Sequence, residues 1–297
     1  MVRRGRTFDS RRSSRRSRKV TLPALLAGRR GSNGQRDVPS EALKVADFST
    51  EAAGALARCD DAGVVLSFVR LEPEGPEELG RTGHQRAAVA AVAETYARWA
   101  RHLEDELVEL ARHPELFDQR ETQYRIQALD SASPFERWRV RRRVLPPFWL
   151  VRAQTRGRLR RMRRGVLKNG NAARRFDPAR LSGKRIDVGE FFGPGLSDGS
   201  PVSAIDWSRP YSADTLDFTY ALCNPPYSLR IRDAELDTLF AAVVRHVLNE
   251  PDESTEIWSW DTEWSPYFDD GRDWWGTGLW TLDVGDAIVA VLASATD

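Results

Sequence analysis

The chain has few residues of the kinds that form disulfides, bind metals or carry out hydrolysis. Its 297 residues include two cysteines and four histidines. Cys59 and Cys223 lie far apart, and no histidine stands near either at ligand spacing, so neither a disulfide framework nor a zinc site is predicted. The scattered histidines suggest no Ser-His-Asp or Cys-His arrangement. We therefore expect no metal and no cofactor, and we favour a protein that is not an enzyme.

Long apolar runs are also missing. A helix that crosses a bilayer needs about 20 consecutive, mostly apolar residues. No run in this sequence approaches that length. We therefore expect a cytoplasmic protein that does not span a membrane.

Charge is divided into four blocks along the chain. Residues 1–36 carry 12 Lys/Arg against one acid, and residues 137–185 carry 18 against one. Residues 37–136 carry 10 against 20, and residues 186–297 carry 5 against 21. The net charge of +2 hides this alternation. Two interpretations stay open: the blocks screen one another, or a basic block is kept for an external polyanion.

Composition divides the chain into four regions. Residues 1–38 form a basic arm with too little apolar surface to fold, so we expect disorder. Residues 39–168 are predicted to be mainly helical and to end in an Arg-rich helical segment. Residues 169–210, rich in Gly, Pro, Ser and Asn, read as a linker or loop. Residues 211–297 are predicted to form an acidic, Trp-rich α+β domain.

The helical region contains one strong periodic pattern. Its apolar residues recur at steps of three and four and form one stripe of a helix, which comprises Val89, Val92, Tyr96, Trp99, Leu103, Leu107 and Leu110. His113-Pro114 ends this helix, because a residue before proline avoids the helical region. The stripe predicts core packing. A strand is expected over residues 62–71 and a second helix over residues 115–129.

The C-terminal region alternates between two periodicities. Residues 217–223, 255–260, 277–284 and 287–293 alternate or run apolar, as strands do. A helix with a strong apolar face starts after Asp233 and ends near Asn249. Gly285-Asp286 suits a hairpin turn. The predicted fold class is therefore α+β, with a mostly helical N-terminal half and a C-terminal β-α-β-β-β domain whose sheet is largely antiparallel.

Arginines dominate residues 135–168, which Pro146-Pro147 interrupt. Arginine on most faces of a helix, with aromatic residues between, is a good electrostatic footprint for phosphates. No base-reading motif accompanies it. This predicts, as an alternative function, a nucleic-acid-associated protein that grips phosphates through residues 137–164. The candidate contacts are Arg141, Arg142, Arg143, Arg160, Arg161, Arg163 and Arg164.

Six of the ten tryptophans lie within 23 residues near the C-terminus. Such clusters build either a rigid core or a ligand-binding surface. Acids between the rings could also form a carboxylate pair for glycoside hydrolysis. Our leading hypothesis is a surface that binds a basic protein partner, because interface hot spots favour aromatic anchors flanked by charge. Its predicted residues are Trp264, Tyr267, Asp269, Trp274 and Trp275.

This stretch follows the pattern W-S-x-Y-F-D-x-G-x-x-W-W-G over residues 264–276. It resembles a box found in a family of bacterial proteins without an established activity. The resemblance covers about the last 80 residues and implies that they belong to a folded domain. A regulatory or immunity-like role would fit such a protein.

Asn224-Pro225-Pro226-Tyr227 resembles the catalytic tetrapeptide of methyltransferases that act on exocyclic amino groups. In that family the Asn holds the target NH₂ and the Tyr ring stacks on it. Residues 190–195 even resemble the glycine loop for S-adenosylmethionine, but only about 28 residues separate the two, too few for the βαβ units that the fold needs. An amino-group methyltransferase is therefore the third hypothesis.

Overall fold

The computed structural model describes residues 43–73, 80–120, 123, 148–193, 196, 201–205, 216–226, 229–272 and 275–294. Residues 41–297 form one compact unit. The predicted disordered arm over residues 1–38 lies outside the described residues. No helix among the described ranges is long and apolar enough to cross a bilayer.

The centre of the unit is a six-stranded sheet in which all neighbours are antiparallel. The strand order is β1-β2-β6-β5-β4-β3. All six residues of β6 are buried, because β6 lies between two strands and both of its faces are covered. The bounds are β1 Lys44–Ala46, β2 Leu66–Glu72, β3 Gly183–Ile186, β4 Ile257–Trp260, β5 Gly278–Asp283 and β6 Ile288–Ala293.

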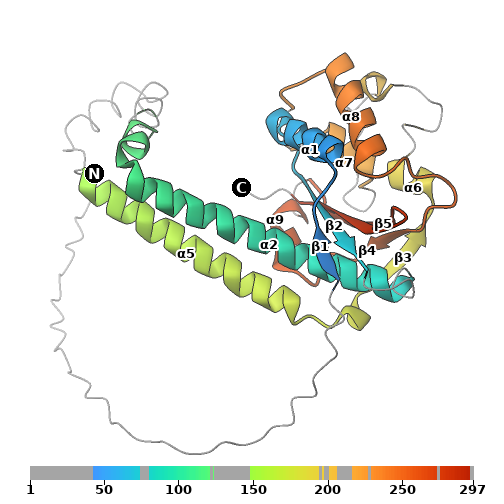
Figure 1. The fold of residues 1–297 in the computed structure, drawn as a ribbon, viewed down its shortest axis with the longest axis horizontal. Coiled ribbons are helices and arrows are strands. Elements are labelled where there is room, and N and C mark those ends of the chain that lie inside the picture. Colours follow the sequence, from blue (N-terminus) through green and yellow to red (C-terminus); the bar gives the residue numbers. More distant parts are fainter. Residues whose placement is uncertain are drawn as a thin grey trace, which may run out of the picture. The chain divides into compact units, whose positions relative to one another are not determined.

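Helices cover both faces of this sheet (Figure 1). One face carries α1 Thr50–Ala62, α6 Val188–Phe192, α7 Phe218–Cys223 and α8 Ala234–His246, and the other carries α2 Arg81–Arg112 and α5 Phe148–Arg174. Shorter pieces are α9 Asp269–Arg272 and the 3₁₀ turns η2 Pro178–Arg180, η4 Val202–Ala204 and η6 Pro266–Phe268. Successive residues of β6 point alternately into the two cores, with Val291 in the first and Leu292 in the second.

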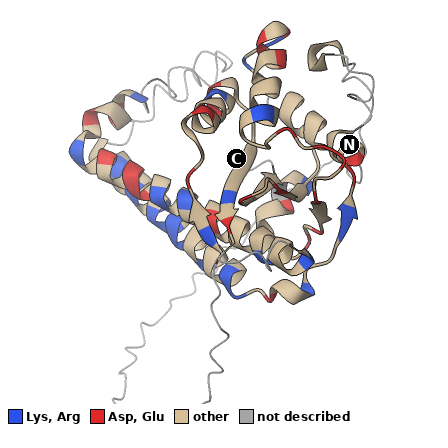
Figure 2. Ribbon diagram, turned by 45° about the vertical axis from the view of Figure 1, so that its right-hand side comes forward, with Lys and Arg blue, Asp and Glu red and all other residues tan. Residues whose placement is uncertain are grey.

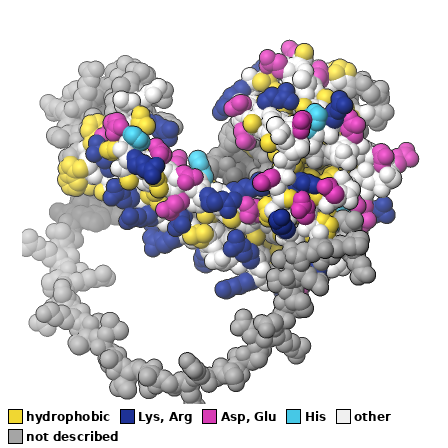
Figure 3. Space-filling model, in the orientation of Figure 1, with side chains coloured by type: hydrophobic (Ala, Val, Ile, Leu, Met, Phe, Trp, Pro, Cys, Tyr) yellow, Lys and Arg dark blue, Asp and Glu magenta, His cyan; other side chains and the backbone are white. Residues whose placement is uncertain are grey.

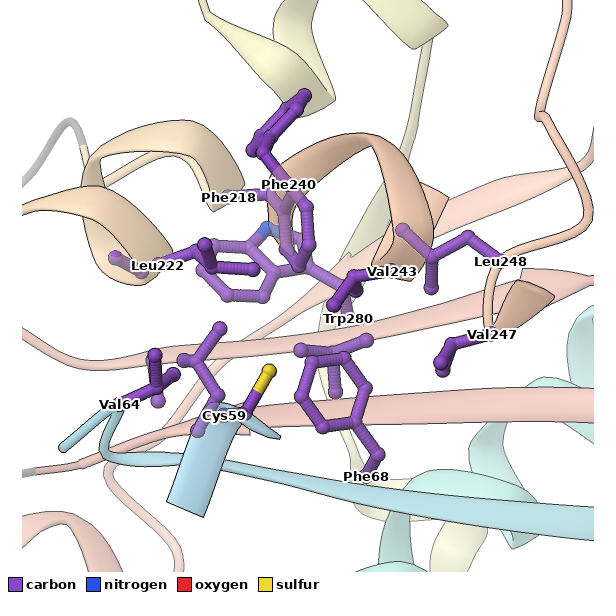
Figure 4. Packing of buried hydrophobic residues seen from close by; sticks show 14 of the residues in the cluster. Cys59, Val64, Phe68, Phe218, Leu222, Phe240, Val243, Val247, Leu248 and Trp280 are labelled. Atoms are coloured by element: carbon purple, nitrogen blue, oxygen red, sulfur yellow. The ribbon is translucent and has the colours of Figure 1, made fainter. Parts of the chain in front are cut away.

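The first core is built around Trp280 of β5, whose ring lies among apolar side chains from α1, β2, α7 and α8 (Figure 4). Trp280 meets Phe191 edge to face with ring centroids 5.9 Å apart. Phe191 in turn stacks on Phe218 at 4.9 Å. These aromatic contacts join α6, α7 and β5 into one packed cluster.

The second core lies between the sheet and α2, and the predicted apolar stripe fills it. Val89, Val92, Tyr96, Leu103 and Leu110 are buried there, which confirms that the stripe serves the protein's own core. The other two stripe residues, Trp99 and Leu107, pack against the same cluster. The helix ends where the sequence predicts, at Arg112. Of the second predicted helix, over 115–129, residues up to 120 and residue 123 are described and are helical.

The β5–β6 hairpin is also as predicted. The Val284 N–H donates to the carbonyl of Ala287 at 2.9 Å, and Gly285 adopts a φ of 96°, which favours glycine. The predicted strands over 255–260, 277–284 and 287–293 correspond to β4, β5 and β6. The helix predicted after Asp233 is α8, although the Asp233 side chain makes no capping hydrogen bond.

Residues 217–223, predicted as a strand, form helix α7 instead. The Asp217 carboxylate accepts a hydrogen bond from the Tyr220 N–H at 2.7 Å and caps the helix. Phe218, Ala221 and Leu222 are fully buried, at the three- and four-residue spacing of a helix face. The strand prediction was wrong because a six-residue apolar segment satisfies both periodicities.

Residues 169–210, predicted as a linker, are largely ordered structure where described. Helix α5 continues to Arg174, and β3 pairs with β4. Gly183 is needed in β3 because a Cβ there would lie 2.2 Å from the Trp260 ring. Glycine in this segment therefore reflects close packing as well as turns.

The sheet also joins the two folded regions that the sequence separates at residue 211. Strands β1, β2 and β3 come before that position, and β4, β5 and β6 come after it. The C-terminal part has the element order α7-α8-β4-β5-β6 and shares its sheet with the rest of the unit.

Candidate functional site

Residues 264–276, which carry the W-S-x-Y-F-D-x-G-x-x-W-W-G pattern, are called the Trp box below. Tyr267 of this box lies in the second core and is only 7% exposed. Its hydroxyl donates to Ser67 Oγ at 3.3 Å, and its ring meets Tyr96 edge to face at 5.8 Å. Burial raises the pKa of this phenol to about 12. The side chain therefore holds the core together and is not part of the surface that the sequence predicts.

The other predicted box residues that the structure describes, Trp264, Asp269 and Trp275, do not gather into one surface. Trp264 is half-buried and packs against the second core, with its ring 4.5 Å from that of Phe176. Trp275 is half-buried against the first core, where its indole N–H donates to the Asn224 carbonyl at 3.0 Å. Asp269 is exposed, 3.8 Å from Arg272. Trp274 lies outside the described residues.

Two neighbouring tryptophans are likewise held by their own scaffold. Trp258 and Trp260 of β4 stack with ring centroids 5.3 Å apart. The Trp260 indole N–H donates to Thr281 Oγ1 at 2.8 Å, and that of Trp258 donates to Glu256 at 2.8 Å. These two indoles therefore pack on the sheet with their N–H groups bonded inside the protein.

Asn224 does not have the setting of a methyltransferase tetrapeptide. It follows helix α7, whereas that chemistry places the Asn directly after a strand. Tyr227 lies outside the described residues. Gly193 lies in the segment that resembles a glycine loop. It ends the short helix α6 with φ 78°, and a Cβ there would lie 2.0 Å from the Asp217 carboxylate. Close packing accounts for this glycine.

The strongly shifted buried acids and thiols have structural roles. Burial raises the pKa of Asp217 to about 6, against the opposing effect of the Tyr220 and Thr219 N–H groups. Burial also raises the pKa of Cys59 to about 12, and that of Cys223 still further. Thiols held protonated in this way are poor nucleophiles. Within the described ranges, no three side chains of His, Cys, Asp or Glu gather as a metal site.

Helix α5 has the second predicted group of site residues, and its position is fixed by α2. Val151, Leu159, Val166 and Ala173 are buried along one side of α5. The two helices run antiparallel and come so close that a Cβ on Gly170 would lie 3.0 Å from Tyr96 Cβ. This contact determines which side of α5 faces outward.

Two of the cations of α5 form ion pairs within the protein. Between Phe148 and Arg174 the helix carries eight arginines, one lysine and no acid. Arg152 makes a two-pronged ion pair with Asp118, which holds the pKa of that carboxyl below its usual range. Arg163 Nε lies 2.7 Å from a Glu104 carboxylate oxygen on α2. These inner cations are paired within the protein.

Four of the exposed cations form a row, which we call the arginine ridge and define as Arg156, Arg160, Arg164 and Lys168. They stand at four-residue steps, about 6 Å apart along the axis, so they lie next to one another in a row that turns slowly round the helix, clear of its buried residues. All four are exposed, and among the described residues none has a carboxylate within ion-pairing distance. Figure 2 shows the cations repeating along α5, and Figure 3 shows the same flank as a surface.

The structure separates the predicted phosphate contacts. Arg160 and Arg164 lie on the ridge, and Arg161 is exposed beside it. Arg163 turns towards α2 and pairs with Glu104. Arg156 and Lys168 were missed as site residues. Their four-residue spacing from Arg160 and Arg164 is visible in the sequence, but the side of the helix that α2 covers is not. The remaining predicted contacts, Arg141, Arg142 and Arg143, lie outside the described residues.

Comparison with protein-family models, with curated proteins and with solved structures finds no match to this chain.

Proposed function

We propose that this chain binds nucleic acid and that the arginine ridge of α5 holds the phosphate backbone. One observation carries the proposal: four exposed cations stand in a row on a helix without a single acid, and no described carboxylate pairs with them. Arginine and lysine in a row suit phosphates, which bring one negative charge per nucleotide.

The ridge has an energetic cost for the isolated protein. Like charges four residues apart on a helix destabilise it by about 0.2–0.5 kcal/mol per pair. Arg156, Arg160, Arg164 and Lys168 make successive pairs of this kind. A polyanion lying along the row would remove that repulsion and release its own condensed counterions.

Screening by the protein's own acids accounts for only part of α5. The carboxylate of Asp118 pairs with Arg152, and that of Glu104 on α2 pairs with Arg163. Arg160, Arg164 and Lys168 lie progressively farther round the helix from Arg163. At physiological ionic strength, interactions between exposed charges fade over about 8 Å, so more distant acids screen the ridge weakly.

Protein binding through the Trp box has less support. Tyr267 is in the core, while Trp264 and Trp275 pack against opposite faces of the sheet. An interface hot spot needs its anchors grouped on one accessible patch. Phosphate contacts, by contrast, need only a row of accessible cations, and they position a nucleic acid without reading its sequence.

The test is salt-dependent binding of the full chain to fluorescein-labelled oligonucleotides, measured by fluorescence anisotropy. The Arg160→Gln/Arg164→Gln variant should bind more weakly. It should also reduce the slope of log affinity against log salt by about 1.4 to 1.8, because two phosphate contacts are lost. The N-terminal arm carries 12 further Lys/Arg. The difference between variants therefore tests the ridge, and the wild-type slope alone does not.

The matched control is Arg101→Gln/Arg245→Gln, which removes the same charge from exposed arginines beside Glu94 and Glu250. The control should keep nearly the whole slope. The proposal fails if both double variants change the slope equally, if neither does, or if wild type binds phosphatidylserine vesicles but no oligonucleotide.

A further inference from the structure

Trp149 is an aromatic side chain that the core does not use. It lies in the first turn of α5 and is 67% exposed. Its neighbour Phe148 is 45% exposed. The buried positions of α5, among them Val151 and Leu159, lie on another side of the helix. Figure 3 shows hydrophobic side chains at this end of the α2–α5 pair.

Trp149 shares its face with the arginine ridge. It stands seven residues before Arg156 and eleven before Arg160, and both separations return to the same side of a helix. The position between the ring and the first ridge cation belongs to Ala153, which is exposed and small. The indole therefore begins the row, about 10 Å along the axis from Arg156.

We infer, on the basis of the proposed function, that the preferred ligand is single-stranded nucleic acid, with a base stacked on Trp149 while the phosphates follow the ridge. A duplex stacks its bases on one another, so an exposed indole finds few base faces there. A single strand offers every base face, and aromatic residues beside a basic track bind it without sequence preference. Arginine and an exposed indole on one face suit both parts of that ligand.

The experiment compares the full chain on oligothymidylate, on oligouridylate and on an A·T duplex of the same length, by anisotropy at one salt concentration. Trp149→Ala should weaken binding of the single strands by about 5- to 150-fold and leave duplex binding nearly unchanged. Trp149→Phe should restore most of the loss, because phenylalanine also stacks. The DNA and RNA arms show whether the 2′-hydroxyl matters.

Leu116→Ala is the matched control, because Leu116 is an exposed apolar side chain on another helix. Ala153→Glu supplies a second variant. It places an acid between the indole and the ridge and should weaken single-strand binding more than the same change at the exposed Ala111 of α2.

The outcomes separate this inference from the proposed function. If Trp149→Ala weakens duplex and single strand equally, or weakens neither, the stacking inference is overturned while the ridge still stands on its own test. If wild type binds none of the three oligonucleotides, the proposed function fails and this inference fails with it.

Discussion

The sheet and helix α5 place tryptophan in opposite environments, one buried and one exposed. Trp280, in the middle of the first core, is 3% exposed and surrounded by apolar rings, whereas Trp149 is 67% exposed beside a row of cations. The tryptophans of β4 bond their N–H groups to side chains of the protein itself, Glu256 and Thr281. A high density of tryptophan is therefore a weak sign of a binding surface. The side chains that the fold leaves unused are the better sign.

The largest expected difference between the two regions is in stability. Trp280→Ala should lower the free energy of unfolding by about 3–5 kcal/mol, because it leaves a large cavity in the first core. Trp149→Ala should stay within about 0.5 kcal/mol of wild type, as surface changes usually do. Urea denaturation followed by circular dichroism measures both. Equal losses would mean that Trp149 has a structural role and that the two tryptophans do not differ as their exposure suggests.

The buried carboxylate of Asp217, at the start of α7, should make the stability of the fold depend on pH. The pKa of Asp217 is about 6 in the folded protein, above its ordinary value of 3.8. Stability from this group is therefore complete below about pH 4 and falls as pH rises towards 6. Asp217→Asn, which keeps a capping side chain, should remove this fall and stabilise the protein at pH 7 by about 2–3 kcal/mol.

Urea denaturation at pH 4, 5, 6 and 7 tests this window, which spans about two pH units above the ordinary pKa. Asp269→Asn is the control, since Asp269 is exposed. If Asp217→Asn shows the same slope of stability against pH as wild type, the buried carboxylate is not the source.

The smallest expected effect concerns the ridge, and it has the opposite sign to the effect on binding. Arg160→Gln/Arg164→Gln removes like-charge pairs, so it should raise the free energy of unfolding by about 0.2–0.5 kcal/mol per pair removed, while it weakens nucleic-acid binding. Replicate urea curves at low salt measure the gain, which should shrink as salt is added. A clear loss of stability would show that these arginines make contacts that hold the fold.

Periodicity predicted the long elements well. The α2 stripe extends over many turns, and the β5–β6 hairpin combines two strong strands with Gly285, so each pattern has only one reading. The α+β class follows from these elements. The strand prediction over residues 217–223 was wrong because a short, mostly apolar segment fits a strand and a helix alike, and the Asp217 cap favours the helix.

Strand β3 could not be predicted from the local sequence, because it depends on packing against β4, which is distant in the chain. Gly183 fits against the Trp260 ring, a contact that no local pattern reveals. The candidate site divides in the same way. Arg160 and Arg164 could be named from the sequence as cations, but only the packing of α5 on α2 shows that they face outward and that Arg163 pairs with Glu104.

The placement of β6 limits how the protein can be divided into fragments. Leu66 of β2 pairs with Ala293 of β6, so neighbouring strands of the sheet come from segments far apart in the sequence. Contacts of such high sequence separation slow folding, because a long loop must close before they form. A fragment holding only the C-terminal strands would expose the flank of β6 that β2 covers, and an uncovered apolar edge invites aggregation. Any dissection of this molecule should therefore keep both strands together.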